Sequence, residues 1–172
     1  MVALSPRFTN AANSIIGGDG WNVMFQASVC RKATAPGCLH GTPQSALSVL
    51  KENHGLGIEA VVIMIGHNDN RGASFIDKVH QLLNEVSDVP HVFLITMREV
   101  SHSYREANRM IKEASAGHQN VHIIDWAELS RNQNSWVAKD GTHITATGAK
   151  NLASLIAQEL RTWCVKDKAK EK

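Results

Sequence analysis

The sequence has no apolar stretch long enough to cross a membrane as a helix. Its longest apolar runs, such as residues 60–65 and 92–95, fall far below the ~20 residues that a membrane span needs. An excess of charge of one sign is also missing, because 18 Lys and Arg face 16 Asp and Glu and leave a net charge of +2. Such a small charge does not predict nucleic acid as an obligatory partner. No basic segment followed by an apolar one opens the chain, so we expect no signal peptide in it.

Cysteine is scarce, and its count of three is odd. Cys30 and Cys38 enclose a loop with Pro36 and Gly37 that could fold back on itself. A disulfide between them would indicate an oxidising compartment, whereas two free thiols would fit a cytosolic protein, and the loop alone does not separate the two cases. Neither cysteine belongs to a C-x-x-C pair with a second pair downstream, so we expect no metal site.

The remaining composition is that of an ordinary globular protein. With 172 residues, 43% of them hydrophobic and 20% charged, the chain has room for one domain with a core of its own. We expect this single domain to span residues 1–165. The tail, residues 166–172, is highly charged, and we expect it to be disordered.

Short apolar runs alternate along the chain with amphipathic stretches. The apolar runs predict strands at residues 21–28, 59–66, 91–97 and 121–126. Helical periodicity predicts helices at residues 3–16, 43–53, 74–86, 103–116 and 145–163. This alternation predicts an α/β domain with a parallel sheet and helices on both sides, in which reactive groups gather at the carboxyl ends of the strands.

One polar segment, Gly66-His67-Asn68-Asp69, directly follows a predicted strand. Gly66 allows a sharp turn there, and the Asn68 carboxamide can donate a hydrogen bond into a cleft above the sheet. Gly, Asn and Asp also favour turns for purely conformational reasons. Taken alone, the segment therefore favours the simpler interpretation, a turn without a catalytic role.

A second polar segment, residues 139–145 (KDGTHIT), precedes the last predicted helix. Asp140 and His143 are three residues apart, so the carboxylate can accept a hydrogen bond from the imidazole Nδ1–H and support the imidazolium. The alternative is helix capping, with Thr142 or Thr145 as the N-cap and Asp140 as a favourable charge near the positive end of the helix. The two segments in this order are more specific than either one alone.

The chain resembles the SGNH (GDSL-type) hydrolase family of esterases and acyltransferases. It is especially similar to the extracytoplasmic SGNH domains related to membrane acyltransferases that modify cell-wall polysaccharides. The Gly-x-Asn-Asp block of the family matches Gly66, Asn68 and Asp69, and its Asp-x-x-His block matches Asp140 and His143. The resemblance covers nearly the whole chain. It implies a flavodoxin-like three-layer α/β/α fold, no cofactor, and a small acyl ester or acylated carbohydrate as substrate.

The resemblance implies acyl transfer through a serine ester. His143 would act first as the general base and then as the acid, with Asp140 as its orienting carboxylate. The oxyanion hole would be formed by the Asn68 amide, at the block that begins with Gly66, and by the backbone N–H of Cys30. The family commonly places a glycine at the position that Cys30 occupies here.

The start of the chain departs from the family pattern. In the family an apolar first strand runs into Gly-Asp-Ser, whereas here Met1 falls where the serine is expected and the first strand is absent. Gly18-Asp19-Gly20 is an alternative position for this block, but a predicted strand follows it directly, so we expect a helix end and turn there. We therefore expect a fragment or a misplaced gene start, with little or no esterase activity as written.

The rival function is a noncatalytic module that binds a glycan or a protein on the same fold. The presence of Asn68, Asp140 and His143 together argues against it, since simple turns and caps do not require all three. The resemblance also pairs Cys30 with Cys38 in a disulfide and so implies a location outside the cytoplasm. It identifies neither the acyl group nor its acceptor.

Overall fold

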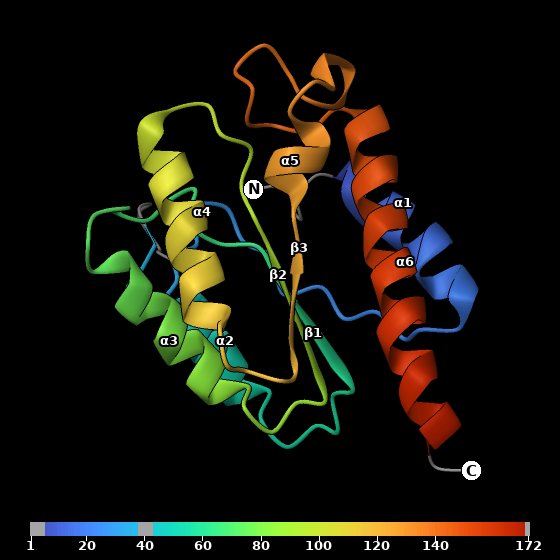
Figure 1. Ribbon diagram of the computed structural model, residues 1–172. Helices are drawn as coiled ribbons and strands as arrows, with labels where there is room; N and C mark the ends of the chain where they lie inside the picture. Colours follow the sequence, from blue (N-terminus) through green and yellow to red (C-terminus); the bar gives the residue numbers. More distant parts are fainter. Residues whose placement is uncertain (1–5, 38–42, 171–172) are drawn as a thin grey trace. The chain divides into compact units, whose positions relative to one another are not determined.

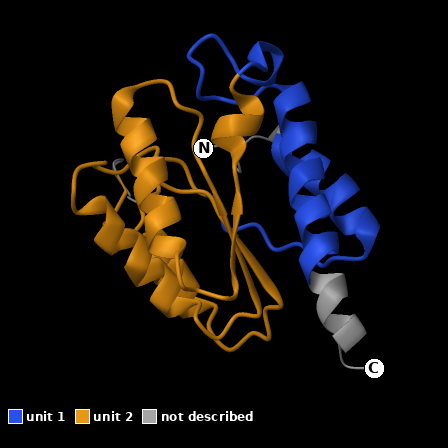
Figure 2. Ribbon diagram, in the orientation of Figure 1, with its two compact units in different colours: residues 1–27, 132–172 blue, residues 28–131 orange. Residues whose placement is uncertain are grey.

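The computed structural model of the chain describes residues 6–37 and 43–170 (Figure 1). The chain divides into two compact units (Figure 2). The sheet unit comprises residues 28–131, and the terminal unit comprises residues 1–27 and 132–172. The single domain predicted over residues 1–165 remains a prediction.

The sheet unit contains a three-stranded parallel sheet with the strand order β1-β2-β3. Its strands are β1 (Ala60–Ile63), β2 (His91–Ile95) and β3 (Val121–Ile124). Each of these lies inside an apolar run that predicts a strand, and the predicted parallel α/β architecture is confirmed. The order places β1 at one edge, and no other strand within the described residues pairs with that edge.

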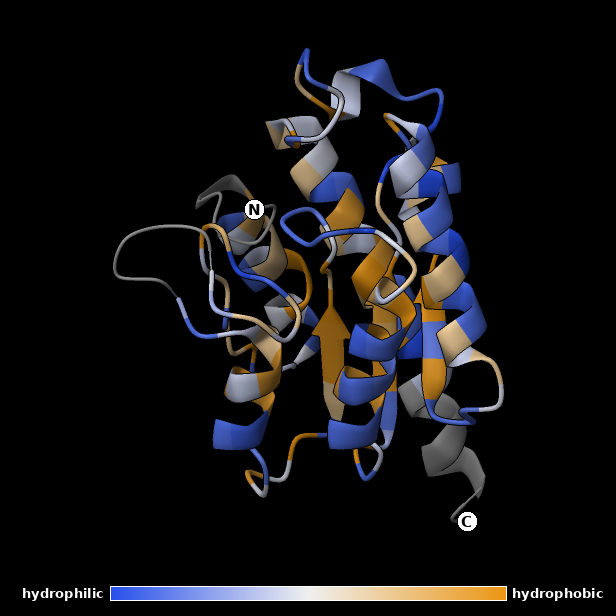
Figure 3. Ribbon diagram, turned by 90° about the vertical axis from the view of Figure 1, so that its left-hand side faces the viewer, coloured by the Kyte–Doolittle hydropathy of each residue, from blue (hydrophilic) through white to orange (hydrophobic). Residues whose placement is uncertain are grey.

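Within the described residues, the sheet unit also contains four helices. They are α2 (Ala46–Glu52), α3 (Phe75–Glu85), α4 (His102–Ser115) and α5 (Trp126–Ser130). Figure 1 shows α2, α3 and α4 on one face of the sheet. The hydropathy colours of Figure 3 show apolar strands and helices whose polar residues alternate with apolar ones.

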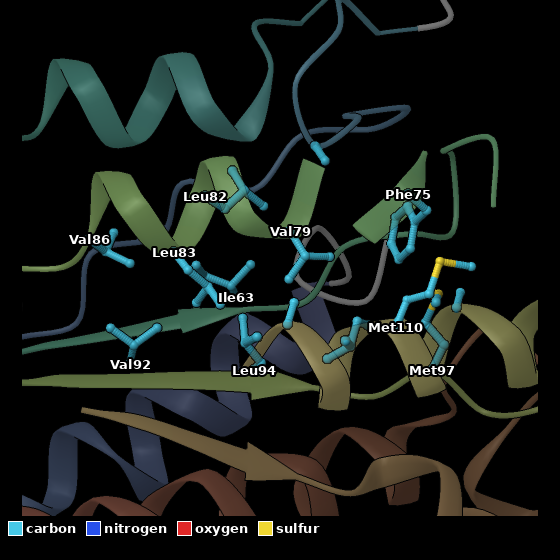
Figure 4. Close-up of a cluster of buried hydrophobic side chains, with 14 residues drawn as sticks. Ile63, Phe75, Val79, Leu82, Leu83, Val86, Val92, Leu94, Met97 and Met110 are labelled. Atoms are coloured by element: carbon cyan, nitrogen blue, oxygen red, sulfur yellow. The ribbon is translucent and has the colours of Figure 1, made fainter. Parts of the chain in front are cut away.

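The core between these helices and the sheet follows from helical periodicity. On α3 the apolar residues Phe75, Val79, Leu82 and Leu83 are spaced so that they share one face, and all four are fully or almost fully buried. They pack in one cluster with residues of the strands, of α4 and of the adjoining segments. Figure 4 labels these four residues together with Ile63, Val86, Val92, Leu94, Met97 and Met110. Full burial of such a side chain contributes about 1.5–3 kcal/mol to folding. This core fixes the ends of β1 and β2, from which the site loops emerge.

The terminal unit is helical. It contains α1 (Pro6–Ile15), the 3-10 turns η2 (Gly17–Asp19) and η3 (Asn134–Trp136), and α6 (Ala146–Lys170). Helix α1 packs along α6, and Arg161 of α6 forms an ion pair with Asp19. No glycine or proline follows residue 148 to interrupt the helix, and α6 continues to Lys170. A disordered tail is predicted over residues 166–172, whereas the structure has a helix over residues 166–170. Within the described residues, no helix has the length and apolarity of a membrane span.

The segment Gly18-Asp19-Gly20 is a helix end and turn, as the sequence predicts. Gly17–Asp19 forms η2, and Gly20 ends it with a φ of +91°, in the left-handed region that favours glycine. The Asp19 carboxylate is paired with Arg161.

The predicted strand at residues 21–28 is wrong, because the structure gives these residues no regular element. Their exposure still alternates as in a strand: Met24 is exposed, whereas Val23 and Phe25 are half-buried. A strand also needs a neighbour that takes up its N–H and C=O groups. Residues 21–28 have no such ladder within the part of the chain that the structure describes.

Candidate active site

The loop that carries Asp140 and His143 is closed by backbone hydrogen bonds within the terminal unit. Val137 and Ile144 form an antiparallel bridge. Ala138 N–H donates to the carbonyl of His143 at 2.7 Å. These bonds bring the two arms of the loop together and hold the backbone of His143 in a fixed position.

Asp140 and His143 interact as the sequence predicts. The Asp140 Oδ2 lies 2.5 Å from His143 Nδ1, while Oδ1 accepts the backbone N–H groups of Thr142 at 2.9 Å and of His143 at 3.0 Å. These backbone bonds, and then the imidazole, lower the pKa of Asp140 to about 2. The carboxylate is therefore ionised at neutral pH and can only accept, so we assign the imidazole proton to Nδ1. This leaves Nε2 as the basic nitrogen, on a side chain that is 48% exposed.

Helix capping, the alternative role for this segment, falls to Thr145 rather than to Asp140. Thr145 Oγ1 accepts the N–H of Gly148 at 3.1 Å, which is the bond of an N-cap, and donates to the carbonyl of Ser135 at 2.6 Å. Asp140 binds only within its own loop. The bond between carboxylate and imidazole and the helix cap are thus both present, and they involve different residues.

Gly148 allows this loop to lie directly on the first turn of α6. A Cβ built on Gly148 would lie 1.9 Å from the carbonyl oxygen of Trp136, far inside van der Waals contact. The same carbonyl accepts the N–H of Thr145 at 2.9 Å. The resemblance matches Thr145 and Gly148 to the family pattern D-G-x-H-x-T-x-x-G, but it assigns Gly148 no role.

In the sheet unit, Gly66 ends the segment that leaves β1 and begins the loop with Asn68. Its φ of +105° favours glycine, and a Cβ there would lie 2.6 Å from Met97 Cε. The turn predicted at this position is present. Its side chains, however, make long-range bonds that a simple turn does not need.

Asn68 and Asp69 join their loop to the loop of residues 30–33. Asn68 Nδ2 donates to the carbonyl of Arg31 at 3.1 Å. Asp69, which is almost completely buried, accepts the Ala33 N–H with its two oxygens at 3.1 and 3.2 Å, and Lys78 Nζ lies 3.6 Å from it. An amide has two N–H donors, and the bond to Arg31 uses one of them.

Arg31 fixes the loop of residues 30–33 from its other side. Its Nη1 donates to the carbonyls of Gln44 at 2.9 Å and Ser45 at 3.2 Å, next to the start of α2. Burial lowers the pKa of Arg31, and Glu52 partly opposes this. The guanidinium keeps its charge, since arginine does not deprotonate in proteins.

Cys30 has the backbone conformation of a glycine position. Its φ is +62°, and it is the single described residue other than glycine with a positive φ. This fits the resemblance, in which a glycine commonly stands there. Cys30 is disulfide-bonded. Cys38 lies outside the described residues, so the pairing of Cys30 with Cys38 stays a prediction.

The structure thus brings the predicted site residues together in two groups. Asp140 and His143 are bonded to each other in the terminal unit. The loops of Cys30 and of Gly66 and Asn68 are bonded to each other in the sheet unit. In the described ranges, no cluster of three or more His, Cys, Asp or Glu side chains could hold a metal ion.

The comparisons with known proteins agree with the predicted family. No protein-family profile matches the chain. O-acetyltransferase OatA of Staphylococcus aureus (strain NCTC 8325 / PS 47) is 30% identical over 104 residues, which are 60% of this chain and 17% of that protein. Peptidoglycan O-acetyltransferase OatA of Listeria monocytogenes (serovar 1/2a, strain EGD-e) is 28% identical over 97 residues, 56% of this chain and 15% of that protein. The chain therefore corresponds to about a sixth of each of these relatives.

Two solved structures share the fold. One is LAE5, an α/β hydrolase from the metagenome of Lake Arreo, with a TM-score of 0.65, 14% identity, and coverage of 90% of this chain and 78% of that one. The other is a family 3 carbohydrate esterase of Clostridium thermocellum, with a TM-score of 0.55, 16% identity, and coverage of 92% and 85%. The chain therefore shares the α/β fold of these two structures. Over part of its length the chain is also similar in sequence to O-acetyltransferases, which is consistent with the predicted SGNH-like domain related to cell-wall acyltransferases.

Proposed function

We propose that this chain contributes the general base and the oxyanion donors of an SGNH-type domain that acts on ester-linked acyl groups, with an O-acetylated carbohydrate as substrate. The observation that carries the proposal is the bond between His143 Nδ1 and a carboxylate that two backbone N–H groups also hold. The names of the relatives, which are O-acetyltransferases, support the choice of acyl group.

In this proposal His143 Nε2 takes the proton of an attacking hydroxyl and later returns it to the leaving group. Asp140 holds the ring and stabilises the imidazolium that forms, and its low pKa keeps it charged throughout. The Asn68 amide and the backbone N–H of Cys30 would donate to the oxyanion. Loss of one such donor typically costs about 3–4 kcal/mol of transition-state stabilisation.

The nucleophile of the family is the serine of Gly-Asp-Ser, a block that this sequence does not contain. We therefore propose that the 172-residue chain has little or no ester turnover by itself. The extended chain, in which an apolar strand ending in Gly-Asp-Ser precedes Met1, would regain it. The alternative function, noncatalytic binding of a glycan or a protein, predicts no ester turnover for the 172-residue chain or for the extended chain.

Labelling with a fluorophosphonate and hydrolysis of p-nitrophenyl acetate test the proposal. We expect the extended chain to be labelled at the added serine and to hydrolyse the ester, and we expect His143→Ala to abolish both. His102→Ala is the matched control, because His102 is an exposed residue at the start of α4. Absence of label in the extended chain, together with binding of acetylated oligosaccharide, would favour the binding module instead.

We also propose an extracytoplasmic location. Peptidoglycan, named in one of the relatives, lies outside the cytoplasmic membrane, and the disulfide of Cys30 needs an oxidising compartment. Alkylation of the protein purified from its native cell, without reductant, should leave Cys30 unmodified. Quantitative modification of Cys30 would contradict this location.

A further inference from the structure

The guanidinium group of Arg71 is bonded to several carbonyl groups of the loop that contains Asn68. Its Nη1 donates to the carbonyl oxygens of Gly66 at 3.0 Å and His67 at 3.1 Å, with that of Asp69 at 3.5 Å. These three carbonyls lie on both sides of Asn68 in the chain. One guanidinium group therefore fixes the peptide planes that set the direction of the Asn68 side chain.

The same guanidinium is anchored on helix α4. Its Nε donates to Ser103 Oγ at 3.3 Å, and its Cζ lies 4.1 Å from the centre of the Tyr104 ring. The face of a guanidinium can stack on an aromatic ring while its N–H groups donate within the plane. The loop that follows β1 is in this way tied to the helix that follows β2.

We infer that Arg71 is a positioning residue for Asn68. This inference rests on the proposed function, because it takes Asn68 as an oxyanion donor. Asn68 is held on one side by its own bond to the Arg31 carbonyl. Arg71 supplies the restraint on the backbone, so that the amide can meet developing charge without first being reoriented. Neither the sequence motifs nor the resemblance assigns a role to Arg71.

Lysine cannot replace Arg71 in this arrangement. A lysine ammonium is a single point on a flexible stem and cannot donate to the loop, donate to Ser103 and stack on Tyr104 at once. Arg71→Lys therefore keeps the charge but loses the geometry. Arg109→Lys is the matched control, since Arg109 lies on α4 and binds only Glu106 and Glu113 of the same helix.

The test is NMR spectroscopy of the full 172-residue chain, which needs no catalytic activity. In Arg71→Lys and Arg71→Ala we expect the side-chain amide signals of Asn68 to shift. We also expect the Ala33 N–H, which is bonded to Asp69, to exchange about tenfold faster. The exchange of Leu94 in the core should stay as in the unaltered chain, and Arg109→Lys should change none of these signals.

Unchanged Asn68 and Ala33 signals in both Arg71 variants would overturn the inference. Faster exchange that includes Leu94 to the same extent, or loss of the fold even in Arg71→Lys, would also overturn it, because the role would then be one of general stability. The proposed function fails separately, if the extended chain with Arg71 intact has no ester turnover. In the active extended chain, Arg71→Lys should lower kcat with little change in KM, since the oxyanion forms only after the substrate has bound.

Discussion

Gly148→Ala is the substitution that most sharply tests how the loop with Asp140 and His143 is held. The new methyl group would lie 1.9 Å from the Trp136 carbonyl oxygen, so the loop must move away from α6. Overpacking of this kind costs about 1–3 kcal/mol. The movement also weakens the bond from Thr145 N–H to that carbonyl, at 2.9 Å, which contributes about 1 kcal/mol. We expect a total loss of about 2–4 kcal/mol in the free energy of unfolding.

Urea denaturation of Gly148→Ala, followed by circular dichroism, measures this loss. Gly18→Ala is the matched control in the same unit, because a Cβ there meets no atom within 4 Å. It should change the free energy of unfolding by no more than about 0.5 kcal/mol. If Gly148→Ala were as stable as Gly18→Ala, the loop would not rest on α6 as described, and the account of how His143 is held would be refuted.

Three further predictions concern the charged and backbone groups of the site. The pKa of Asp140, about 2, lies below its unfolded value, so its carboxylate stabilises the fold above about pH 4, and this contribution is lost as the pH falls towards 2. Carboxyl NMR should show a titration midpoint near 2 for Asp140. A midpoint near 4 would contradict the backbone hydrogen bonds to this carboxylate. Asp69→Ala leaves the buried Ala33 N–H without its acceptor and should cost about 1–3 kcal/mol in urea denaturation, whereas a loss under 0.5 kcal/mol would mean that the two loops are not joined there. Gly66→Ala should be destabilised by about 2–4 kcal/mol because of its positive φ and the contact with Met97. In a double-mutant cycle, Gly66→Ala should cost less in a Met97→Ala background than in the unaltered chain; an equal cost in both would contradict the contact with Met97 as a cause.

The sheet and the Asp140–His143 pair could be predicted because their signals are local. Uninterrupted apolar runs predict the three strands, and the spacing of three residues between Asp140 and His143 predicts the bond between carboxylate and imidazole. Residues 21–28 carry a similar local signal but form no strand. A strand depends on a partner elsewhere in the chain, and no pattern inside the segment reports whether that partner is present.

The residues that hold the site in place could not be predicted, because their partners are far away in the sequence. Asp69 and Ala33 are separated by 36 positions, and Arg71 and Ser103 by 32. Residue type alone indicates a turn aspartate and an exposed arginine. The sequence also does not decide which residue caps α6, since Thr142 and Thr145 both fit. The bond from Gly148 N–H to Thr145 Oγ1 assigns the cap to Thr145.

The central claim, that His143 and Asn68 serve one acyl-transfer reaction, is tested most directly by kcat/KM of the extended chain on an acetyl ester. Asn68→Ala should lower kcat/KM by about 100- to 1,000-fold, the usual effect of removing one oxyanion donor, and His143→Ala should reduce it to the background. Ester turnover that is unchanged in Asn68→Ala, or that survives in His143→Ala, would contradict the claim.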